Sequence, residues 1–428
     1  MKTYLINSTS ETSKISDKCV LEVSKDLTKS IYYRIGYMLY GSLLLSYCNW
    51  IHEYCIRNSI ECVMFLARDG YSIKKAWTNI FNDIDSKYLY ASRSSVLETR
   101  IRDDISVSNL INNITDKKSI SVKGIIDAFR LPEKETKDLR IKFGISNGLM
   151  IFPDRYYKDS DVREYFEELL SLVKNNIEER SRLFEEYIRK NFETYSRVAV
   201  VDIGWRGTIQ EGIETAAKYL GIETEIHGLY LGVYGKGQGR RNIQNARGYL
   251  YNAEDKERLK KLKTFRGLAE FFFSAPHGKV IGYEKTNGSI IPILEEYEYR
   301  RDFGAGSIEE QALMEMQDGA IDYVSDMKRI KDLVAMTRDE AMMPLYSFSI
   351  DADLSDIEIL GDLHFYSDTM EMIAKPKSID YYLYDHAELK KDFAKSVWKI
   401  GFMKRLLHNI PFPYVQAYNF LLKRYGVI

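Results

Sequence analysis

The sequence has little cysteine, proline or histidine and no excess of either charge. Its four cysteines are Cys19, Cys48, Cys55 and Cys62, and none of them forms a CxxC pair. This pattern argues against a zinc site or a disulfide framework, so we expect reduced thiols in the core of a cytoplasmic protein. A formal net charge of −1 gives no general case for nucleic-acid binding.

Long apolar runs are also missing. The longest, Ile35–Tyr47, is interrupted by glycine and serine and is too short to cross a bilayer, so we interpret it as a buried helix. The first fourteen residues lack the apolar core of a secretory signal. What is present is an ordinary globular composition, 45% hydrophobic and 29% charged, in a chain of 428 residues. That length is typical of two or three domains.

The most informative segment is VAVVDIGWRGTIQ, at 198–210. Its first four residues are apolar without polar alternation, which is typical of a strand in a parallel sheet covered on both faces. Asp202 follows at the carboxyl end of this strand, where open α/β sheets bind their ligands. Gly204 and Gly207 predict a turn, and Thr208 can cap the next helix. The free N–H groups of that helix would form an anion site, although similar turns in many α/β proteins only cap and pack.

A second strand–loop–helix unit precedes the first. CVMFL at 62–66 predicts another buried strand, which runs into Arg68, Asp69 and Gly70, and a further strand ends near Arg93. If these strands are parallel neighbours, their charged residues converge at one edge of the sheet. Arginines suit phosphate oxygens, while carboxylates suit sugar hydroxyls or a Mg²⁺ ion that bridges phosphates. The ligand class is then a phosphorylated sugar or nucleotide; the alternative is a set of structural ion pairs.

The order of elements predicts an α/β fold with a mostly parallel sheet. Residues 1–28 are interpreted as a polar, loosely held lead-in and 29–295 as the α/β core, with a helical insertion at about 97–195. Residues 296–428 form a mainly helical C-terminal region. The expected helices are 29–60, 72–81, 166–192, 209–220 and 265–273, and the expected strands are 62–66, 87–91, 198–201, 227–233, 246–251 and 279–284, with another strand as an option near 345–350.

The two loops resemble the arrangement of type I phosphoribosyltransferases. In that family an early loop contacts the pyrophosphate of 5-phosphoribosyl 1-pyrophosphate (PRPP), and a later strand with acids, glycine and threonine holds the ribose 5-phosphate. The resemblance implies a phosphoribosyltransferase-like sheet, Asp202 on the ribose hydroxyls, and Mg²⁺ brought by the donor pyrophosphate rather than by dedicated protein ligands. The family signature has two adjacent acids, whereas Ile203 stands at the second position here. The residues that would surround the 5-phosphate are Gly204, Trp205, Arg206, Gly207 and Thr208.

Several motifs together resemble a module joined to haloacid-dehalogenase (HAD) hydrolase domains in bacterial capsule and O-antigen synthesis proteins. The motifs are FLARDGY, YLYASR, VVDIGWRGTIQ, GLYLG and EFFFSAPHGKVIGYE. This resemblance implies a glycosyltransferase that passes ribose 5-phosphate from PRPP, or from a related phosphosugar donor, to a glycan acceptor, lipid-linked or free. A separate HAD phosphatase would then remove the phosphate. The chain itself lacks the paired aspartates of a HAD phosphatase, because Gly204 stands two residues after Asp202.

Other roles stay open. The chain could be a HAD-like sugar-phosphate hydrolase or a non-catalytic scaffold of a capsule assembly complex. Ile203 supports the scaffold alternative, because it stands where the family signature has a second acid. Glu270 lies in an apolar run and could act as the base, orient the acceptor or hold Arg266. Asp69 is the other candidate base. His277, beside proline and glycine, is either a turn residue or a substrate contact.

Two basic segments complete the sequence. From 388 to 428 there are eight lysines and arginines against two acids, interleaved with aromatic residues. This region either rests as a peripheral contact on the inner face of an anionic membrane or packs its apolar side on the core. The loop GKGQGRR at 235–241 is a solvated basic segment that could close over a donor.

Overall fold

The computed structural model describes residues 1–115, 119–235, 243, 245–253, 255–330, 334–367 and 369–425, so most of the basic loop at 235–241 lies outside the described residues. The described part of the chain folds around a five-stranded parallel sheet of order β2-β1-β5-β6-β7. Counted along the chain this is the 2-1-3-4-5 order of a doubly wound sheet, whose direction of winding reverses between β1 and β5. The expected α/β class is confirmed. The strands are β1 (Cys62–Leu66), β2 (Asp85–Leu89), β5 (Arg197–Trp205), β6 (Glu225–Val233) and β7 (Ala246–Tyr251).

Side chains of the central strands alternate between two apolar clusters, one on each face of the sheet. Val63 and Phe65 belong to one cluster, whereas Met64 and Leu66 belong to the other. Continuous apolar strands therefore reflect burial on both sides. The first face is covered by α3 (Gly41–Arg57), α4 (Gly70–Ile80), α11 (Lys256–Phe272), α13 (Ile308–Arg329) and α14 (Arg338–Asp351). The second is covered by α9 (Ser160–Phe192), α10 (Thr208–Leu220) and an antiparallel hairpin of β8 (Val280–Thr286) and β9 (Ser289–Leu294).

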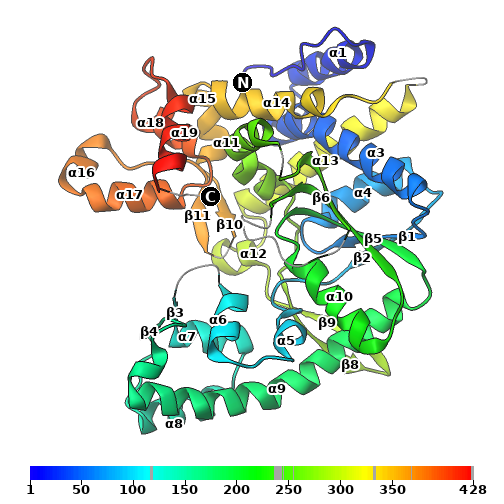
Figure 1. Ribbon diagram of the computed structural model, residues 1–428. Coiled ribbons are helices and arrows are strands. Elements are labelled where there is room, and N and C mark those ends of the chain that lie inside the picture. The colour runs from blue at the N-terminus through cyan, green and yellow to red at the C-terminus, as the bar shows by residue number, and fades with distance from the viewer. Residues whose placement is uncertain are drawn as a thin grey trace.

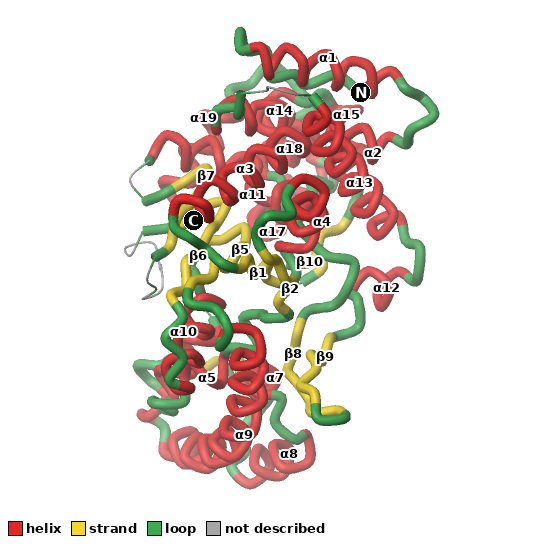
Figure 2. The backbone as a smooth tube through the Cα atoms, turned by 90° about the vertical axis from the view of Figure 1, so that its right-hand side faces the viewer, coloured by secondary structure: helices red, strands yellow, loops and turns green. Residues whose placement is uncertain are grey.

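The segment between β2 and β5 is helical and has an apolar core of its own. Ile111, Phe129, Phe166 and Leu169 belong to that core. Figures 1 and 2 show this segment at one end of the molecule, with the sheet between it and the N- and C-terminal helices. Its elements before α9 are α5 (Leu97–Ile101), α6 (Val107–Ile114), β3 (Ile120–Ser121), α7 (Val122–Phe129), α8 (Glu133–Lys142), β4 (Met150–Ile151) and a 3₁₀ turn (Tyr156–Lys158).

The N-terminal segment and the C-terminal region pack into the core on the first face of the sheet. Tyr4 is buried, and its hydroxyl donates to Asp356 at 2.9 Å, so residues 1–28 are held in place and contain a helix. Phe348 and Trp398 belong to the same apolar cluster as Val63. The remaining elements are α1 (Glu11–Lys25), α2 (Ile31–Ile35), a π-helical turn (Gly36–Tyr40), α12 (Glu298–Phe303), α15 (Leu354–Gly361), β10 (His364–Tyr366), β11 (Met370–Met372), α16 (Ile379–Tyr384), α17 (His386–Lys395), α18 (Lys399–Leu406) and α19 (Tyr414–Tyr425).

Four expectations about local structure need correction. The segment near 345–350 is helical, because Thr337 and Glu340 form a capping box that starts α14. The helix expected at 29–60 is divided by the π-helical turn that begins at Gly36, where α13 approaches so closely that a Cβ atom would lie 1.8 Å from the Met316 carbonyl oxygen. The strand expected at 87–91 is shifted toward the N-terminus, to Asp85–Leu89, and the strand expected at 198–201 continues to Trp205. The strand expected at 279–284 is present as β8 and belongs to the hairpin.

The basic C-terminal region packs its apolar side on the core. Trp398 and Phe402 are both about 1% exposed, and Lys404 is buried with its ammonium group donating to the Ala352 carbonyl at 2.9 Å. Among the helices in the described ranges, none combines the length and apolarity needed to cross a membrane. Peripheral membrane contact stays a prediction.

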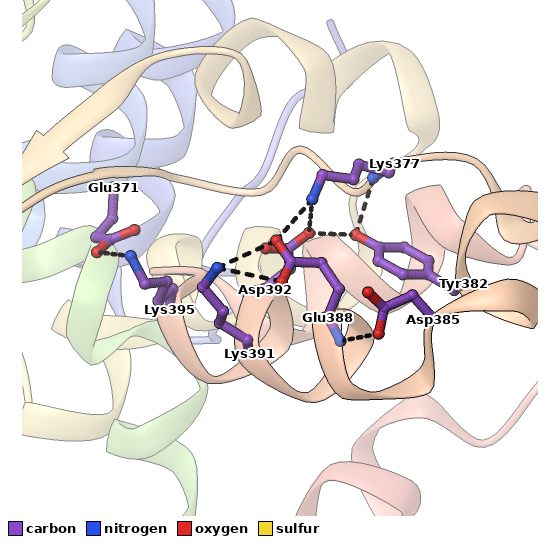
Figure 3. A network of polar contacts seen from close by, with 8 residues as sticks. All are labelled: Glu371, Lys377, Tyr382, Asp385, Glu388, Lys391, Asp392 and Lys395. Atoms are coloured by element: carbon purple, nitrogen blue, oxygen red, sulfur yellow. Dashed lines mark hydrogen bonds and ion pairs between the residues drawn. The ribbon is translucent and has the colours of Figure 1, made fainter.

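Two lysines of this region, and Lys377 shortly before it, are ion-paired within the protein. Figure 3 shows the Lys377 ammonium between Glu388 and Asp392, at 2.9 and 3.1 Å, and the Tyr382 hydroxyl donating to Asp392. The other pairs are Lys391 with Glu388 and Lys395 with Glu371. Part of the positive charge counted from the sequence is thus neutralised inside the fold.

Candidate functional site

Two carboxyl groups meet at the carboxyl ends of β1 and β5, where the winding of the sheet reverses. Asp202 lies on β5 with 7% of its surface exposed, and Asp69 follows β1 as the residue before α4. The two strands are parallel neighbours, with Phe65 paired to Val201. The side chains of Asp69 and Asp202 lie close enough for each carboxyl group to shift the pKa of the other. Two ionised carboxylates offer only acceptors, so a direct hydrogen bond between them requires a proton on one of the two.

The electrostatics of this pair favour sharing a proton near neutral pH. Burial raises the pKa of Asp69 to about 6; Arg68 and Arg93 lower it, while Glu270 raises it. Burial and the Asp69 charge raise the pKa of Asp202 well above its usual range. Two close, desolvated carboxyl groups cannot both ionise cheaply, so the pair titrates as a unit.

The backbone around Asp202 is fixed by close contacts. The Tyr47 hydroxyl donates to the carbonyl oxygens of both Asp202 and Leu229, at 2.8 and 3.0 Å, and so ties β5 to β6. Gly204 has φ +136°, and a Cβ atom there would lie 2.3 Å from the Gly232 carbonyl oxygen. Only glycine fits this position. Gly204 therefore belongs to β5 rather than to a turn after it.

Arginines surround the carboxyl pair. Arg68 forms an ion pair with Glu298, whose side chain is 2% exposed. Arg93 is exposed in the loop after β2, and its charge acts on both carboxyl groups of the pair. Arg206 is half-buried between β5 and α10. The expected convergence of Arg68, Arg93 and the two acids is thus present, with one of the arginines already bound to a buried acid.

Trp205, the last residue of β5, is held by a cluster of charged and aromatic side chains. Its indole N–H donates to Glu270 Oε1 at 2.8 Å, and Arg266 Nε donates to the same oxygen at 2.8 Å. The Arg266 guanidinium lies 5.1 Å from the Trp205 ring centre and donates to the Tyr234 hydroxyl at 2.7 Å. Of the roles considered for Glu270, holding Arg266 is the one with a direct contact.

The two helices that follow the sheet edge begin at glycines. Gly207, with φ +76°, precedes α10, and a Cβ atom there would meet the Ile243 side chain at 2.2 Å. Thr208 is the first residue of α10 and does not cap it, which corrects the expectation from the sequence. Gly70 starts α4 against the backbone of Phe65. The N-terminus of α10 directly follows Arg206, so its N–H groups and this arginine could act together on an anion.

His277 is held in a turn beside the site. Its Nδ1–H donates to the Gly278 carbonyl at 2.8 Å, because a carbonyl oxygen can only accept. Its pKa is lowered, chiefly by burial and also by the Arg68 charge, so the ring is neutral and Nε2 accepts from the Tyr88 hydroxyl at 2.8 Å. His277 thus has a structural partner on each nitrogen and lies within the field of Arg68.

Three partners of the site had no clear signal in the sequence. Tyr47 and Tyr88 are two of 32 tyrosines, and Glu298 lies 230 residues from the arginine it binds. Contacts of this kind depend on the tertiary fold.

The residues present fit a Mg²⁺ ion that arrives with a pyrophosphate. Within the described ranges, no group of three or more His, Cys, Asp or Glu side chains is arranged to hold a metal ion by itself. Mg²⁺ is commonly bound by one or two carboxylates together with substrate phosphate oxygens. Asp69 and Asp202 are two such carboxyl groups, and a bound cation would favour their ionised forms.

Comparison with known proteins does not identify a family. No protein-family model matches the sequence, and no curated protein matches it. Inferences about function therefore depend on the geometry of the site.

Proposed function

We propose that the chain is a glycosyltransferase of the phosphoribosyltransferase type that acts in bacterial surface polysaccharide synthesis. It would transfer ribose 5-phosphate from PRPP, or from a related phosphosugar donor, to a hydroxyl group of a glycan acceptor. The observation that carries this proposal is the meeting of Asp69 and Asp202 at the reversal point of a parallel sheet, where the two strands that lead to them are neighbours. Ile203, at the position of the usual second acid, is 2% exposed within the apolar core, and Asp69 from the neighbouring strand supplies a second carboxyl group instead.

Each group would have a distinct task. Asp202 binds the ribose hydroxyls and the Mg²⁺ of the donor, while Arg206 and the N–H groups at the start of α10 bind the 5-phosphate. The acceptor oxygen forms a bond to the anomeric carbon as the bond from that carbon to pyrophosphate breaks. Asp69 accepts the proton of the acceptor hydroxyl. The bound Mg²⁺ supplies positive charge that stabilises the leaving pyrophosphate, a task shared by Arg93.

Turnover tests this proposal directly. Wild-type protein incubated with PRPP, Mg²⁺ and glycan acceptors should release pyrophosphate, and Asp202→Ala should abolish the release. Asp380→Ala, which removes an exposed aspartate far along the chain, is the matched control and should keep wild-type activity. If calorimetry detects no binding of PRPP to the wild-type protein, the donor assignment is overturned.

The pH dependence tests the role of Asp69. Since its pKa is about 6, kcat/KM should fall as the pH is lowered through about 6, because the protonated carboxyl group cannot accept a proton. Asp69→Asn should lower kcat/KM by roughly 10²–10⁴-fold and remove this acidic limb. A wild-type profile that stays flat across this range would rule out Asp69 as the base.

A hydrolase is the second candidate, since a carboxyl pair that shares a proton can also activate water. Assays on the same wild-type protein distinguish a hydrolase from the proposed transferase. Release of phosphate from sugar phosphates in the absence of an acceptor favours the hydrolase, whereas binding of a partner phosphatase with no ligand binding favours a scaffold.

A further inference from the structure

A cavity of about 260 Å³ lies between the helical insertion and the β8–β9 hairpin. Glu98 of α5, Arg130 after α7, Arg180 of α9 and Tyr283 of β8 contribute to its lining. It is smaller than most sites for drug-sized ligands, which span roughly 300–1,000 Å³. A small molecule or ion fits this volume, whereas a polymer does not. Neither carboxyl group of the Asp69–Asp202 pair lines the cavity, so it is separate from the proposed catalytic site.

Arg180 is held by three contacts with the protein. Its two terminal nitrogens donate to the carbonyl oxygens of Phe129 and Ile281, at 2.9 and 3.2 Å. Its Nη2 also lies 2.9 Å from Glu98 Oε1, and the Glu98 side chain is 3% exposed. Glu98 therefore neutralises Arg180, and the arginine bridges the insertion to the hairpin.

Arg130 differs from Arg180 in its hydrogen bonding. Its Nη2 is buried with no hydrogen-bond partner among the residues that the structure describes. The backbone adopts a left-handed conformation at this residue, φ 47°, immediately after α7. Gly282 leaves room for the guanidinium, since a Cβ atom there would lie 3.3 Å from Arg130 Nη1. A buried, unpaired guanidinium nitrogen is costly, because the group stays charged at neutral pH.

The acids nearby do not fully compensate Arg130. Burial lowers the pKa of Arg130 to about 10, and the Arg180 charge adds to this effect, while Glu98 and Glu295 act in the opposite direction. Glu98 is bound to Arg180, and Glu295 lies 3.4 Å from Lys279. Glu179 also lines the cavity but is exposed at its rim. The cavity thus presents one arginine on which the nearby acids act only through their charge, and whose Nη2 has no hydrogen-bond partner among the described residues.

We propose that this cavity binds a small oxyanion, the carboxylate or phosphate group of a small molecule, with Arg130 as its principal ligand. A guanidinium presents several N–H groups in one plane, which matches the paired oxygens of a carboxylate or phosphate. Arg180 lies nearby, paired with Glu98 and fixed by its own contacts. The site is independent of the proposed glycosyl transfer.

Binding of inorganic phosphate, and separately of acetate, is the test. Calorimetry on the full chain should show binding of at least one of these anions to the wild-type protein, and their relative affinities distinguish a phosphate site from a carboxylate site. Arg130→Gln should weaken that binding at least about tenfold, because a charge-assisted hydrogen bond is lost. Arg182→Gln, an exposed arginine on the same helix as Arg180, is the matched control and should bind as the wild type does.

Two further variants separate the loss of anion binding from misfolding and from binding at the Asp69–Asp202 site. Arg130→Lys retains the charge but loses the planar fork, so it should bind more weakly than the wild type even if Arg130→Gln does not fold by circular dichroism. Asp202→Ala should leave this anion binding intact. The proposal is overturned if the wild type binds neither anion, if Arg130→Gln and Arg130→Lys both bind as tightly as the wild type, or if binding depends on Asp202 instead. Turnover of PRPP by Arg130→Gln should be unaffected. A failure of the anion-binding proposal would therefore leave the proposed transferase function untouched.

Discussion

Two pairs of like charges, each at least partly buried, differ in how their repulsion is relieved. Asp69 and Asp202 meet at the ends of β1 and β5, where burial raises the pKa of both carboxyl groups. Arg130 and Arg180 meet in the cavity beneath the helical insertion. A carboxyl group can take up a proton when burial raises its pKa, whereas a guanidinium cannot lose one near neutral pH.

This difference assigns different chemistry to the two regions. The aspartate pair relieves its repulsion with a proton that it can exchange, which suits acid–base catalysis. In the arginine pair, Glu98 forms an ion pair with Arg180 and acts on Arg130 only through its charge, so one buried nitrogen of Arg130 has no hydrogen-bond partner among the described residues. An external anion would supply that partner, which suits binding rather than catalysis.

Removing the neutralised arginine should have the largest effect on stability. Arg180→Met leaves Glu98 buried without its cation and two carbonyl groups without their donor, so the free energy of unfolding should fall by about 3–5 kcal/mol. Urea unfolding followed by circular dichroism measures this change. The double variant Glu98→Gln/Arg180→Met should recover part of the loss, since no charge is then stranded. Equal stability of Arg180→Met and wild type would show that the pair is not buried in solution.

Removing one member of the aspartate pair should change how stability depends on pH. Burial and the Asp69 charge raise the pKa of Asp202 in the folded protein, so the folded state binds more protons than the unfolded chain does. Wild-type stability should therefore fall as the pH rises through about 6, the pKa of Asp69, and beyond it. Asp202→Asn removes the repulsion and should lose less stability over that range.

Thermal unfolding of Asp202→Asn at a series of pH values checks this expectation. The variant should be inactive as a transferase yet more stable than the wild type at alkaline pH, the usual trade between stability and function at an active site. Asp380→Asn, at an exposed position, should follow the wild-type curve. Parallel curves for Asp202→Asn and wild type would mean that the two carboxyl groups do not interact.

The sequence was sufficient to predict the parallel sheet but not all of its surroundings. Continuous apolar runs identified β1 and β5, and Gly70 and Gly207 marked the starts of the helices that follow them, because these signals are local, whereas Gly204 lies within β5. The segment LYSFSI, at 345–350, alternates like a strand, yet a capping box and packing on the core make it helical. Its helix even contains Pro344. The short alternating pattern at 345–350 was misleading, because the capping box at Thr337 starts a helix that continues through this segment.

At the candidate site, too, some features could be predicted from the sequence and others depend on the tertiary fold. Convergence of Asp69 and Asp202 followed from the rule that parallel strands end at one edge, so it could be expected once both strands were recognised. Their shared proton could not be expected, because it depends on burial and on side-chain separation. The pairing of Arg68 with Glu298 joins residues 230 positions apart and has no local signal. Arg130 was not singled out either, since an arginine that follows a helix is ordinary until its surroundings are known.

The smallest expected effect separates the two arginines of the cavity. Without added anion, Arg130→Gln should change the free energy of unfolding by no more than about 1 kcal/mol, because it removes both an unpaired nitrogen and the repulsion from Arg180. Arg180→Met, by contrast, breaks an established ion pair. Added phosphate should then stabilise the wild type in proportion to the logarithm of its concentration above Kd, and should stabilise Arg130→Gln only at concentrations at least about tenfold higher. Urea unfolding with and without phosphate measures both effects. A large loss of stability in Arg130→Gln without anion would place its missing partner inside the protein, and the contrast between a proton-sharing pair and an anion-requiring pair would no longer hold.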